Sequence, residues 1–478
     1  MNFLSVQFAS FYIILFIILL FIRDLKKRNV ILLVANVVFY SLGDLRSLPI
    51  LIFEIVMAYF LARKIGAEKK RGGSGRSYTA AGVIITVLIL VLCKYLLFIG
   101  GIFFGSSFKQ DHGELGLFQP IGISYYSLMV ISYLVDVYRG KMEAEHDLIT
   151  VGLYISFFPQ IMSGPVTKAR KLIDQFKEVH PITKAGVYQG MQIFLTGALK
   201  KVLIADRLAV YTNAIYASPA EYSGLSVFFG TISFWVQLYC DFSGYTDMAV
   251  GISTIFGYKL ARNFDLPFIA KNPTETWKRW HMSLSSWLQE YVYFSLGGNR
   301  KGTIRQYLNL IITMVVGGLW HGAAWGYVLW GLQSGLGLCI HKLFTTWRKN
   351  LTEKQGFKFD PPVPVRKAAD VLSIVLNFFF FLTGSILFRS ESFADSLCIF
   401  KRIATMAAGV EYYYVYFFIY VGLIMIAFAV ACIKNGGHGF YINMNLDRFG
   451  PAVLFITAVL ITVIFGYFGN NVFVYAQF

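Results

Sequence analysis

The chain has 478 residues, of which 56% are hydrophobic and 14% are charged. Soluble globular domains average about 45–50% apolar and about 25% charged residues, so this composition excludes a disordered chain, a disulfide-rich secreted scaffold and an ordinary soluble enzyme. The net charge is +17, and the bases lie in short loops beside apolar runs, a pattern typical of membrane proteins rather than of nucleic-acid-binding ones. The sequence therefore predicts an all-α polytopic membrane protein with no nucleic-acid partner. Its bases would face membrane lipids or a phosphate-rich donor.

The N-terminal part of the chain predicts a regular series of membrane helices. Apolar runs occur at 8–22, 29–42 and 48–62. No base precedes the first run and no small-residue cleavage site follows it, so we expect a retained helix rather than a signal peptide. Two basic loops, 23–28 and 63–76, are separated by two spans and so lie on the same side. Because basic loops stay in the cytoplasm, the N-terminus is predicted to be extracytoplasmic.

Further apolar runs follow along the chain. Those at 80–104 and 120–137 predict two more spans, and the loop 105–118 has one base and two acids, which fits the extracytoplasmic face. The segment 346–367 holds six bases and is expected in the cytoplasm. The last apolar runs lie at 368–388, 412–433 and 452–472. Counting all runs of sufficient length predicts about 11–14 membrane segments.

The central third of the chain interrupts its apolar runs with glycine, proline and ionisable residues. Pro159, Gly164 and Pro165 would kink or break a helix. Broken backbone at membrane depth is tolerated only inside protein or beside a water-filled cavity. We therefore divide one predicted transmembrane domain, 1–478, into N-terminal spans at 1–150, a core at 151–345 and C-terminal spans at 346–478.

His321 is the most conspicuous candidate for chemistry. It lies near the middle of 306–340, which contains no Asp, Glu, Lys or Arg. One straight helix of that length would measure about 52 Å, against a hydrocarbon core of about 30 Å. The run must therefore be two helices or one broken helix, with Gly318 and Gly322 among the glycines at the break. A structural histidine at a hairpin tip is one interpretation; a general base that activates a hydroxyl is the other, which we favour.

A second histidine, His281, lies among tryptophans and bases. The segment is typical of a helix at the membrane interface, where Lys278 and Arg279 would reach lipid phosphates. The functional alternative is the wall of a cytoplasmic entrance, in which these two cations attract a phosphate-bearing donor and His281 assists. Trp280 and Trp320, each next to a histidine, are included as candidate substrate-binding residues.

Asp241 and Asp247 interrupt another apolar stretch. Charged groups at membrane depth are costly unless they are paired or face a cavity. Two aspartates six residues apart are weak evidence for metal binding, so no metal is expected, and helix pairing or the lining of a polar cavity is favoured. The five cysteines show no C-x-x-C spacing and are expected to be packing residues. No motif of a P-loop NTPase, a nucleophile-elbow hydrolase or an H-E-x-x-H zinc enzyme is present.

Several motifs together resemble one family. They are PIGISY at 120–125, YLVDVYRG at 133–140, FFPQIMSGP at 157–165, DFSGYTDMA at 241–249, WHMSLS at 280–285 and GLWHG at 318–322. With these motifs the chain resembles the membrane-bound O-acyltransferases, in particular their bacterial branch of alginate O-acetylation and teichoic acid D-alanyl transfer proteins. The C-terminal segment 471–478 is similar to the end of the alginate-type members.

The resemblance implies a fold and a set of roles. The fold would be a ring of tilted helices around a thin centre with a catalytic tunnel, in a bacterial cytoplasmic (inner) membrane. His321 would be the principal catalytic residue, and His281 the second catalytic residue. The family precedent implies transfer of acetyl groups from a cytoplasmic thioester, acetyl-CoA or another acyl thioester, with no bound cofactor. The acetyl groups would pass to an extracytoplasmic partner transferase of the serine-esterase type, which modifies an exported polysaccharide.

Two other functions remain as alternatives. A D-alanyl transferase would use the same chemistry with an acyl carrier protein as its thioester donor. A proton-coupled transporter or flippase would instead use Asp241, Asp247 and His321 as a relay, although no internal repeat supports such an architecture.

Overall fold

The structure is a computed structural model, and it describes residues 2–105, 119–355, 362–438, 441 and 443–469. The chain forms two compact units. The first comprises Met1–Ala198, Gly244–Ala261 and Ile442–Ile464, and the second comprises Leu199–Ser243, Arg262–Tyr441 and Phe465–Phe478. The first unit thus draws segments from all three predicted parts of the chain. One of the boundaries between the units, between Ser243 and Gly244, falls inside the helix α13 (Gly224–Ile255).

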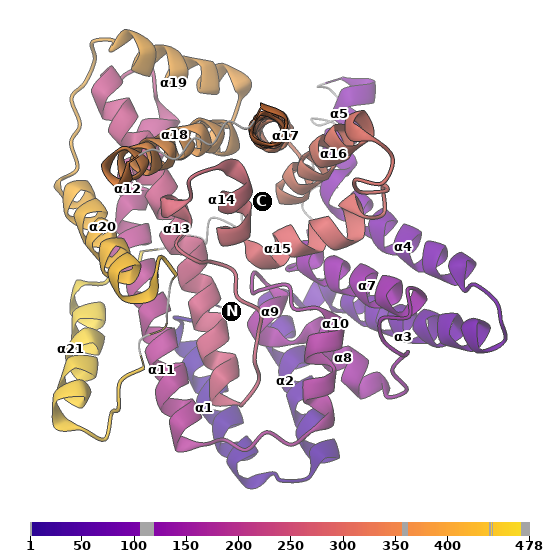
Figure 1. Ribbon diagram of the computed structural model, residues 1–478. Helices are drawn as coiled ribbons and strands as arrows, with labels where there is room; N and C mark the ends of the chain where they lie inside the picture. The colour runs from indigo at the N-terminus through magenta and orange to yellow at the C-terminus, as the bar shows by residue number, and fades with distance from the viewer. Residues whose placement is uncertain (1, 106–118, 356–361, 439–440, 442, 470–478) are drawn as a thin grey trace. The chain divides into compact units, whose positions relative to one another are not determined.

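The described residues of the first unit form helices joined by loops (Figure 1). In chain order they are α1 (Val6–Phe21), α2 (Leu25–Asp44), η1 (Leu45–Ser47), α3 (Leu48–Lys70), α4 (Arg76–Leu90), η2 (Val91–Tyr95), α5 (Leu96–Phe104), α7 (Ile123–Tyr138), α8 (Leu148–Ser156), α9 (Phe158–Ile161), α10 (Ala169–Leu172), η4 (Asp174–Lys177), α11 (Lys184–Ala198), the end of α13, and α21 (Phe449–Phe465). Helices α3, α4 and α7 pack against one another. The side chain of Asp24 caps the start of α2 by accepting a hydrogen bond from Lys27 N.

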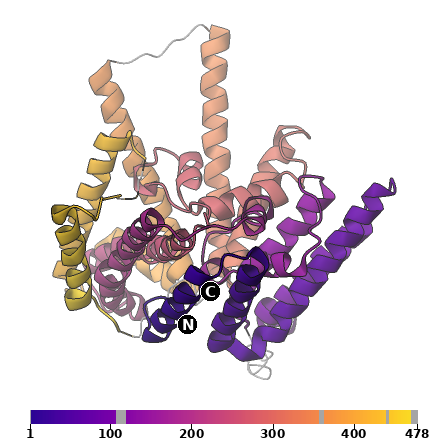
Figure 2. The same cartoon turned by 90° about the horizontal axis from the view of Figure 1, so that it is seen from below.

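The second unit is also helical in its described residues. Its elements are η5 (Leu199–Ala205), α12 (Asp206–Ala217), the first part of α13, η6 (Pro267–Ile269), α14 (Pro273–Arg279), α15 (Met282–Trp287), η7 (Leu288–Tyr293), α16 (Thr303–His321), α17 (Trp325–Gln355), α18 (Val363–Arg389), α19 (Phe393–Thr405) and α20 (Val415–Asn435). Figure 2 shows the length of α17, which is the upright one of the two light orange helices on either side of the grey segment at the top. Helix α17 packs along both α16 and α18.

The all-α polytopic architecture is confirmed. Four segments of the described chain are long and apolar enough to cross a membrane: Leu25–Lys70, Arg76–Phe104, Gly224–Ile255 and Val363–Arg389. Five shorter apolar helices accompany them. The predicted helix break is also present, because α9 ends at Ile161 and the next helix begins only at Ala169. The protein is therefore a membrane protein with an interrupted central region.

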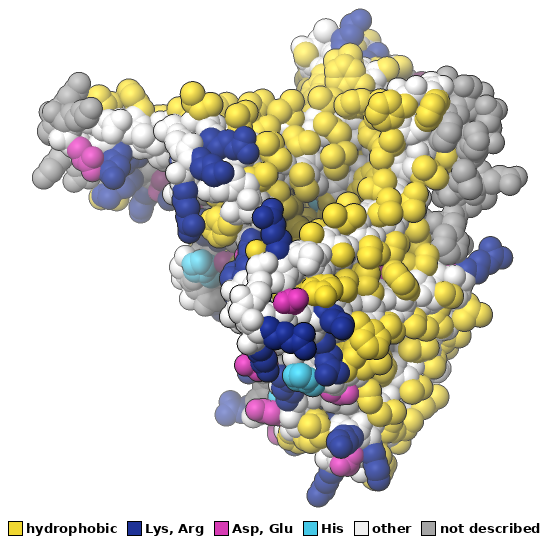
Figure 3. Space-filling view, turned by 90° about the vertical axis from the view of Figure 1, so that its right-hand side faces the viewer, with side chains coloured by type: hydrophobic (Ala, Val, Ile, Leu, Met, Phe, Trp, Pro, Cys, Tyr) yellow, Lys and Arg dark blue, Asp and Glu magenta, His cyan; other side chains and the backbone are white. Residues whose placement is uncertain are grey.

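Hydrophobic side chains on the outer helices are exposed. On α4, Ile84 is 64% exposed and Leu88 is 52% exposed, and Leu372 and Leu376 on α18 are exposed to a similar degree. Figure 3 shows broad areas of hydrophobic side chains, with lysines and arginines gathered apart from them. Soluble proteins rarely expose apolar patches of this extent, so these surfaces are suited to contact with lipid chains.

Two predicted loops differ from the structure or lie partly outside it. The basic loop predicted at 63–76 is mostly helix, since α3 continues to Lys70; lysine, arginine, alanine and glutamate all favour helix once a span has started it. Most of the predicted loop 105–118 lies outside the described residues, as does the C-terminal motif 471–478. The basic segment 346–367 includes the end of α17 and the start of α18, and its residues 356–361 lie outside the described residues.

Candidate active site

His321 is the last residue of α16, and the backbone leaves the helix at Gly322. The run 306–340 is thus two helices, as the sequence predicts, with the break at His321. The two helices approach closely at this point, because a Cβ on Gly318 would collide with the carbonyl oxygen of Tyr327. The His321 side chain is buried, at 3% exposure. It lies among aromatic rings, with centroids 5.2 Å away at both Trp330 and Phe388.

His281 precedes the first residue of α15 and adopts the left-handed conformation, with φ 44° and ψ 49°. Its side chain is 1% exposed, and the ring of Phe242 meets it edge-on at 4.7 Å. The two histidine rings are close together, with 6.2 Å between the centroids of His281 and His321. His281 lies outside the candidate membrane spans, and burial lowers the pKa of its imidazole to about 3. The structure therefore brings the two predicted histidines together, with His281 neutral at physiological pH.

The two predicted tryptophans have different surroundings. The indole of Trp320 lies near both histidines, at 5.0 Å from His321 and 5.9 Å from His281 between centroids. Trp280 instead stacks on Trp235 at 4.7 Å and meets Phe264 edge-on at 5.1 Å. Trp280 is therefore part of an aromatic cluster against α13, whereas Trp320 belongs to the immediate surroundings of the histidines.

Lys278 and Arg279 also differ. Arg279 donates hydrogen bonds to the Glu275 carboxylate at 2.8 Å and to the carbonyl oxygens of Asp265 and Gly437 at 3.0 and 2.7 Å. These contacts tie α14 to the loop before it and to the end of α20. Lys278, in contrast, lines a pocket. Of the two predicted donor-attracting cations, the structure places Lys278 at an accessible cavity and binds Arg279 within the protein.

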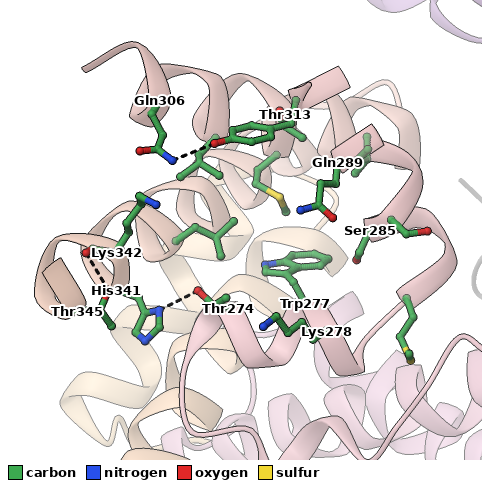
Figure 4. A pocket seen from close by; sticks show the side chains of 17 residues that line it. Thr274, Trp277, Lys278, Ser285, Gln289, Gln306, Thr313, His341, Lys342 and Thr345 are labelled. Carbon is green, nitrogen blue, oxygen red and sulfur yellow. Dashed lines mark hydrogen bonds between the residues drawn. The ribbon is translucent and has the colours of Figure 1, made fainter. Parts of the chain in front are cut away.

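The pocket at Lys278 has a volume of about 610 Å³ (Figure 4). Its walls come from α14, α15, η7, α16 and α17, and include the indole of Trp277 and several polar side chains. At one end, His341 Nδ1 and Thr274 Oγ1 are 2.8 Å apart and Lys342 lies nearby. Met282, the residue after His281, also lines this pocket. The polar residues of the lining are Thr274, Lys278, Ser285, Ser286, Gln289, Tyr293, Gln306, Thr313, His341, Lys342 and Thr345.

Asp241 belongs to a buried ion cluster. Lys201 Nζ lies 2.7 Å from Asp241 Oδ1 and 2.8 Å from Asp206 Oδ1, and all three side chains are less than 10% exposed. This pairing between η5, α12 and α13 agrees with the helix-pairing interpretation of Asp241. The sequence analysis missed Lys201 and Asp206; the signal was a lysine and an aspartate in the largely apolar segment that precedes α13.

Asp247 lies on α13 as well, but in the part of that helix that belongs to the first unit, where it is buried. It is therefore not among the residues that the second unit assembles around the histidines.

Within the described residues, no group of three or more His, Cys, Asp and Glu side chains could hold a metal ion. The features assembled in the second unit are two neighbouring histidines, an aromatic enclosure and a pocket with a cationic end.

Comparison with known proteins identifies the family. The sequence matches the model of the MBOAT, membrane-bound O-acyltransferase family over residues 141–385, a range that includes both histidines and the pocket. The chain belongs to the membrane-bound O-acyltransferase family. It is therefore an acyltransferase enzyme of the membrane.

Alignments with individual relatives span most of the chain. The probable alginate O-acetylase AlgI of Pseudomonas aeruginosa is 35% identical over 398 residues, which is 82% of this chain and 72% of that protein. The peptidoglycan O-acetyltransferase of Helicobacter pylori is 31% identical, with 77% and 72% covered. The teichoic acid D-alanyltransferase of Bacillus subtilis is 27% identical, with 68% and 81% covered. The relatives named for O-acetylation are thus more similar to this chain than the one named for D-alanyl transfer.

Proposed function

We propose that this protein moves acetyl groups from a cytoplasmic thioester across the bacterial cytoplasmic membrane for the O-acetylation of an exported, alginate-like polysaccharide. The observation that carries the proposal is the 6.2 Å approach of His281 and His321, at the break between α16 and α17. The similarity to relatives named as O-acetylases supports an acetyl group as the group transferred. The whole chain would act as one catalytic transmembrane domain.

We assign the chemistry to His321. In its neutral form, the imidazole would take the proton from an acceptor hydroxyl as the hydroxyl oxygen attacks the thioester carbonyl carbon. The carbon–sulfur bond then breaks, the thiolate leaves and receives the proton from His321, and the acetyl ester is formed. General base assistance of this kind contributes typically 10²–10⁴-fold. A route in which His321 itself carries the acetyl group between donor and acceptor is the alternative.

The pocket at Lys278 is suited to the arm of the donor. A thioester donor of this class ends in a phosphopantetheine arm, which carries amide groups along an extended chain and a phosphate at the far end. The pocket offers amide and hydroxyl partners such as Gln289 and Thr313, and two cations, Lys278 and Lys342. We therefore propose that Lys278 binds donor phosphate, that Trp320 lies against the acyl group, and that Arg279, Trp280, Asp241 and Asp247 hold the surrounding protein in place.

Orientation and partners complete the proposal. The donor side, with the basic loops, would face the cytoplasm, and the N-terminus would lie outside. The acceptor would be an extracytoplasmic transferase of the serine-esterase type, whose hydroxyl receives the acetyl group before the polymer does. Neither step needs a bound cofactor.

The experiment is thioester turnover by the purified protein in detergent. With radiolabelled acetyl-CoA and a short hydroxyl acceptor, we expect acetyl transfer that is lost in His321→Ala and retained in His146→Ala, a matched histidine variant whose side chain is exposed in the first unit. Lys278→Met should raise KM for the donor with little change in kcat. Full acetyl transfer by His321→Ala would overturn the assignment.

Assays with different thioester donors distinguish the proposed function from the two alternatives. Turnover of a D-alanyl carrier-protein thioester in place of acetyl-CoA would identify the protein as a D-alanyl transferase, in line with its more distant relatives. A transporter would require a proton gradient, so turnover in detergent, where no gradient exists, would exclude that alternative.

A further inference from the structure

His281 stands in a backbone conformation that few side chains adopt. Its φ of 44° and ψ of 49° place it in the left-handed region, which L-residues with a Cβ disfavour because the Cβ crowds the next carbonyl oxygen. Such residues persist only where the surrounding structure holds them, and they cluster at functional sites. Something in the second unit must therefore hold His281 in this conformation.

Hydrogen bonds from the loop before α14 hold His281 in this conformation. Two backbone hydrogen bonds of 2.9 Å flank His281: Asp265 N donates to the Arg279 carbonyl oxygen, and Met282 N donates to the Asn263 carbonyl oxygen. The Asn263 side chain adds two more, since its Oδ1 accepts from Ser283 Oγ at 2.5 Å and from Ser283 N at 3.3 Å. Asn263 is fully buried and Ser283 is 4% exposed, so these bonds are made away from water.

These bonds also replace a helix cap. The residue before a helix normally caps it, with its side chain accepting hydrogen bonds from the first N–H groups. His281 stands at that place before α15 but makes no such bond. Asn263, from the loop before α14, accepts from Met282 N and Ser283 N instead. The capping is thereby transferred to Asn263, and the imidazole of His281 can face His321 rather than the start of its own helix.

We propose that Asn263 and Ser283 are positioning residues, which hold His281 in its left-handed conformation beside His321 through the hydrogen bond from Ser283 Oγ to Asn263 Oδ1. This inference rests on the proposed function, because it gives the pair a role only if His281 takes part in acyl transfer. In this role, Asn263 and Ser283 affect the rate by fixing the position of the His281 ring.

The test is a set of kcat and KM measurements on full-length protein in detergent, with acetyl-CoA as donor. Ser283→Ala should lower kcat about tenfold, as expected for loss of one buried hydrogen bond, while KM for the donor changes less than twofold. Asn263→Ala removes both hydrogen bonds to Asn263 Oδ1 and should lower kcat at least as much. Ser283→Thr keeps the hydroxyl and should restore kcat. Ser385→Ala is the matched control, since this buried serine of the same unit donates only to the Leu382 carbonyl oxygen of its own helix, and it should keep the wild-type kcat.

Double variants distinguish positioning from general stability. The variant with both Asn263→Ala and Ser283→Ala should be no slower than the slower single variant, because Asn263→Ala already removes the hydrogen bond that Ser283→Ala removes. Ser283→Ala should also have no further effect on kcat in a His281→Ala background. A wild-type kcat in Ser283→Ala would overturn the proposal. So would a Ser283→Ala substitution that lowers kcat by the same factor in the His281→Ala background as in the wild-type protein.

The outcomes also separate this inference from the proposed function. If the wild-type protein transfers no acetyl group from acetyl-CoA, the proposed function has failed and the positioning role falls with it. If His281→Ala keeps full turnover, His281 takes no part in acyl transfer and the positioning role is wrong while the proposed function stands. If both histidine variants are slow but Ser283→Ala is not, only the positioning role is wrong. If Asn263→Ala does not fold, Ser283→Ala decides by itself, since it leaves the backbone hydrogen bonds of the loop in place.

Discussion

The ring centroids of His281 and His321 lie 6.2 Å apart, at the start of one helix and the end of another. At this separation the two rings are direct neighbours, so a small acyl group bound beside them can contact both imidazoles. Both side chains are buried, and burial lowers the pKa of His281 to about 3, which makes it a weak base. Under the proposed function, His281 therefore orients the reacting group by hydrogen bonding, and His321 acts as the general base.

We expect the two histidine variants to differ in severity. His321→Ala should lower kcat by about 10²–10⁴-fold, the usual contribution of a general base. His281→Ala should lower kcat less, by about tenfold, as for the loss of one hydrogen-bonding group. Rates of acetyl transfer from acetyl-CoA, normalised to the amount of folded protein, measure both effects. Equal losses in the two variants would contradict this division of roles.

Because His281 is buried, the folding stability of the protein is expected to depend on pH. Its folded-state pKa of about 3 lies below the unfolded value of about 6.5, so below pH 6.5 the unfolded chain binds a proton that the folded chain does not. Stability is therefore full above about pH 6.5 and is lost as the pH falls towards 3, by about 2 kcal/mol at pH 5. Thermal unfolding of wild type and His281→Asn at pH 7.5 and pH 5 should show a smaller acid shift in the variant. An identical shift would show that another group is responsible.

Lys201 is expected to be important for folding rather than for turnover. Its buried ammonium group pairs with two carboxylates, because Lys201 Nζ lies 2.8 Å from Asp206 Oδ1 and 2.7 Å from Asp241 Oδ1. Removing one partner from a buried ion cluster costs about 3–5 kcal/mol, so Lys201→Met should strongly lower the unfolding temperature in detergent. Asp241→Asn leaves one lysine with one aspartate and should cost less.

The combined variant with Lys201→Met and Asp241→Asn provides a check on this cluster. Because it also removes one of the two buried carboxylates, it should unfold at a higher temperature than Lys201→Met alone. A combined loss equal to the sum of the two single losses would contradict the assignment of the three residues to one electrostatic unit.

Gly318 is expected to be required for the close approach of α16 and α17. A methyl group there would collide with the carbonyl oxygen of Tyr327, so Gly318→Ala must push the helices apart, and overpacking of this kind typically costs about 1–3 kcal/mol. Since His321 follows one turn later on α16, turnover should fall together with stability. The matched control is Gly422→Ala on α20, where a Cβ has no neighbour within 4 Å and no loss is expected. Wild-type stability and kcat in Gly318→Ala would argue against a tight helix pair at the site.

The sequence predicts much of this site because its signals are local. The break at His321 follows from the length of an uncharged run set against the thickness of a bilayer, and the structure has it at that residue. The all-helical membrane architecture follows from the same arithmetic. Lys278 at a pocket was likewise predictable as a cation beside aromatic residues, whereas Arg279, its neighbour with the same charge, is bound to Glu275 and to backbone carbonyls.

Other features depend on which distant segments meet. Nothing in the sequence pairs Lys201 with Asp241, since the two lie on different helices and only packing brings them within 2.7 Å. The same holds for Asn263 and Ser283, which are joined by a hydrogen bond across a loop and a helix start. Patterns along a chain report helix length, breaks and charge, whereas hydrogen bonds between segments depend on how side chains are arranged in three dimensions.

The sequence by itself determined that this is a helical membrane protein with one histidine at a break in an uncharged run, because hydrophobic length and charge placement are properties of the chain alone. The tertiary structure decided that His281 is the neighbour of His321, that its imidazole is neutral, and that a loop holds it in a left-handed conformation. Those properties arise from burial and from contacts between distant segments, which exist only once the chain has folded.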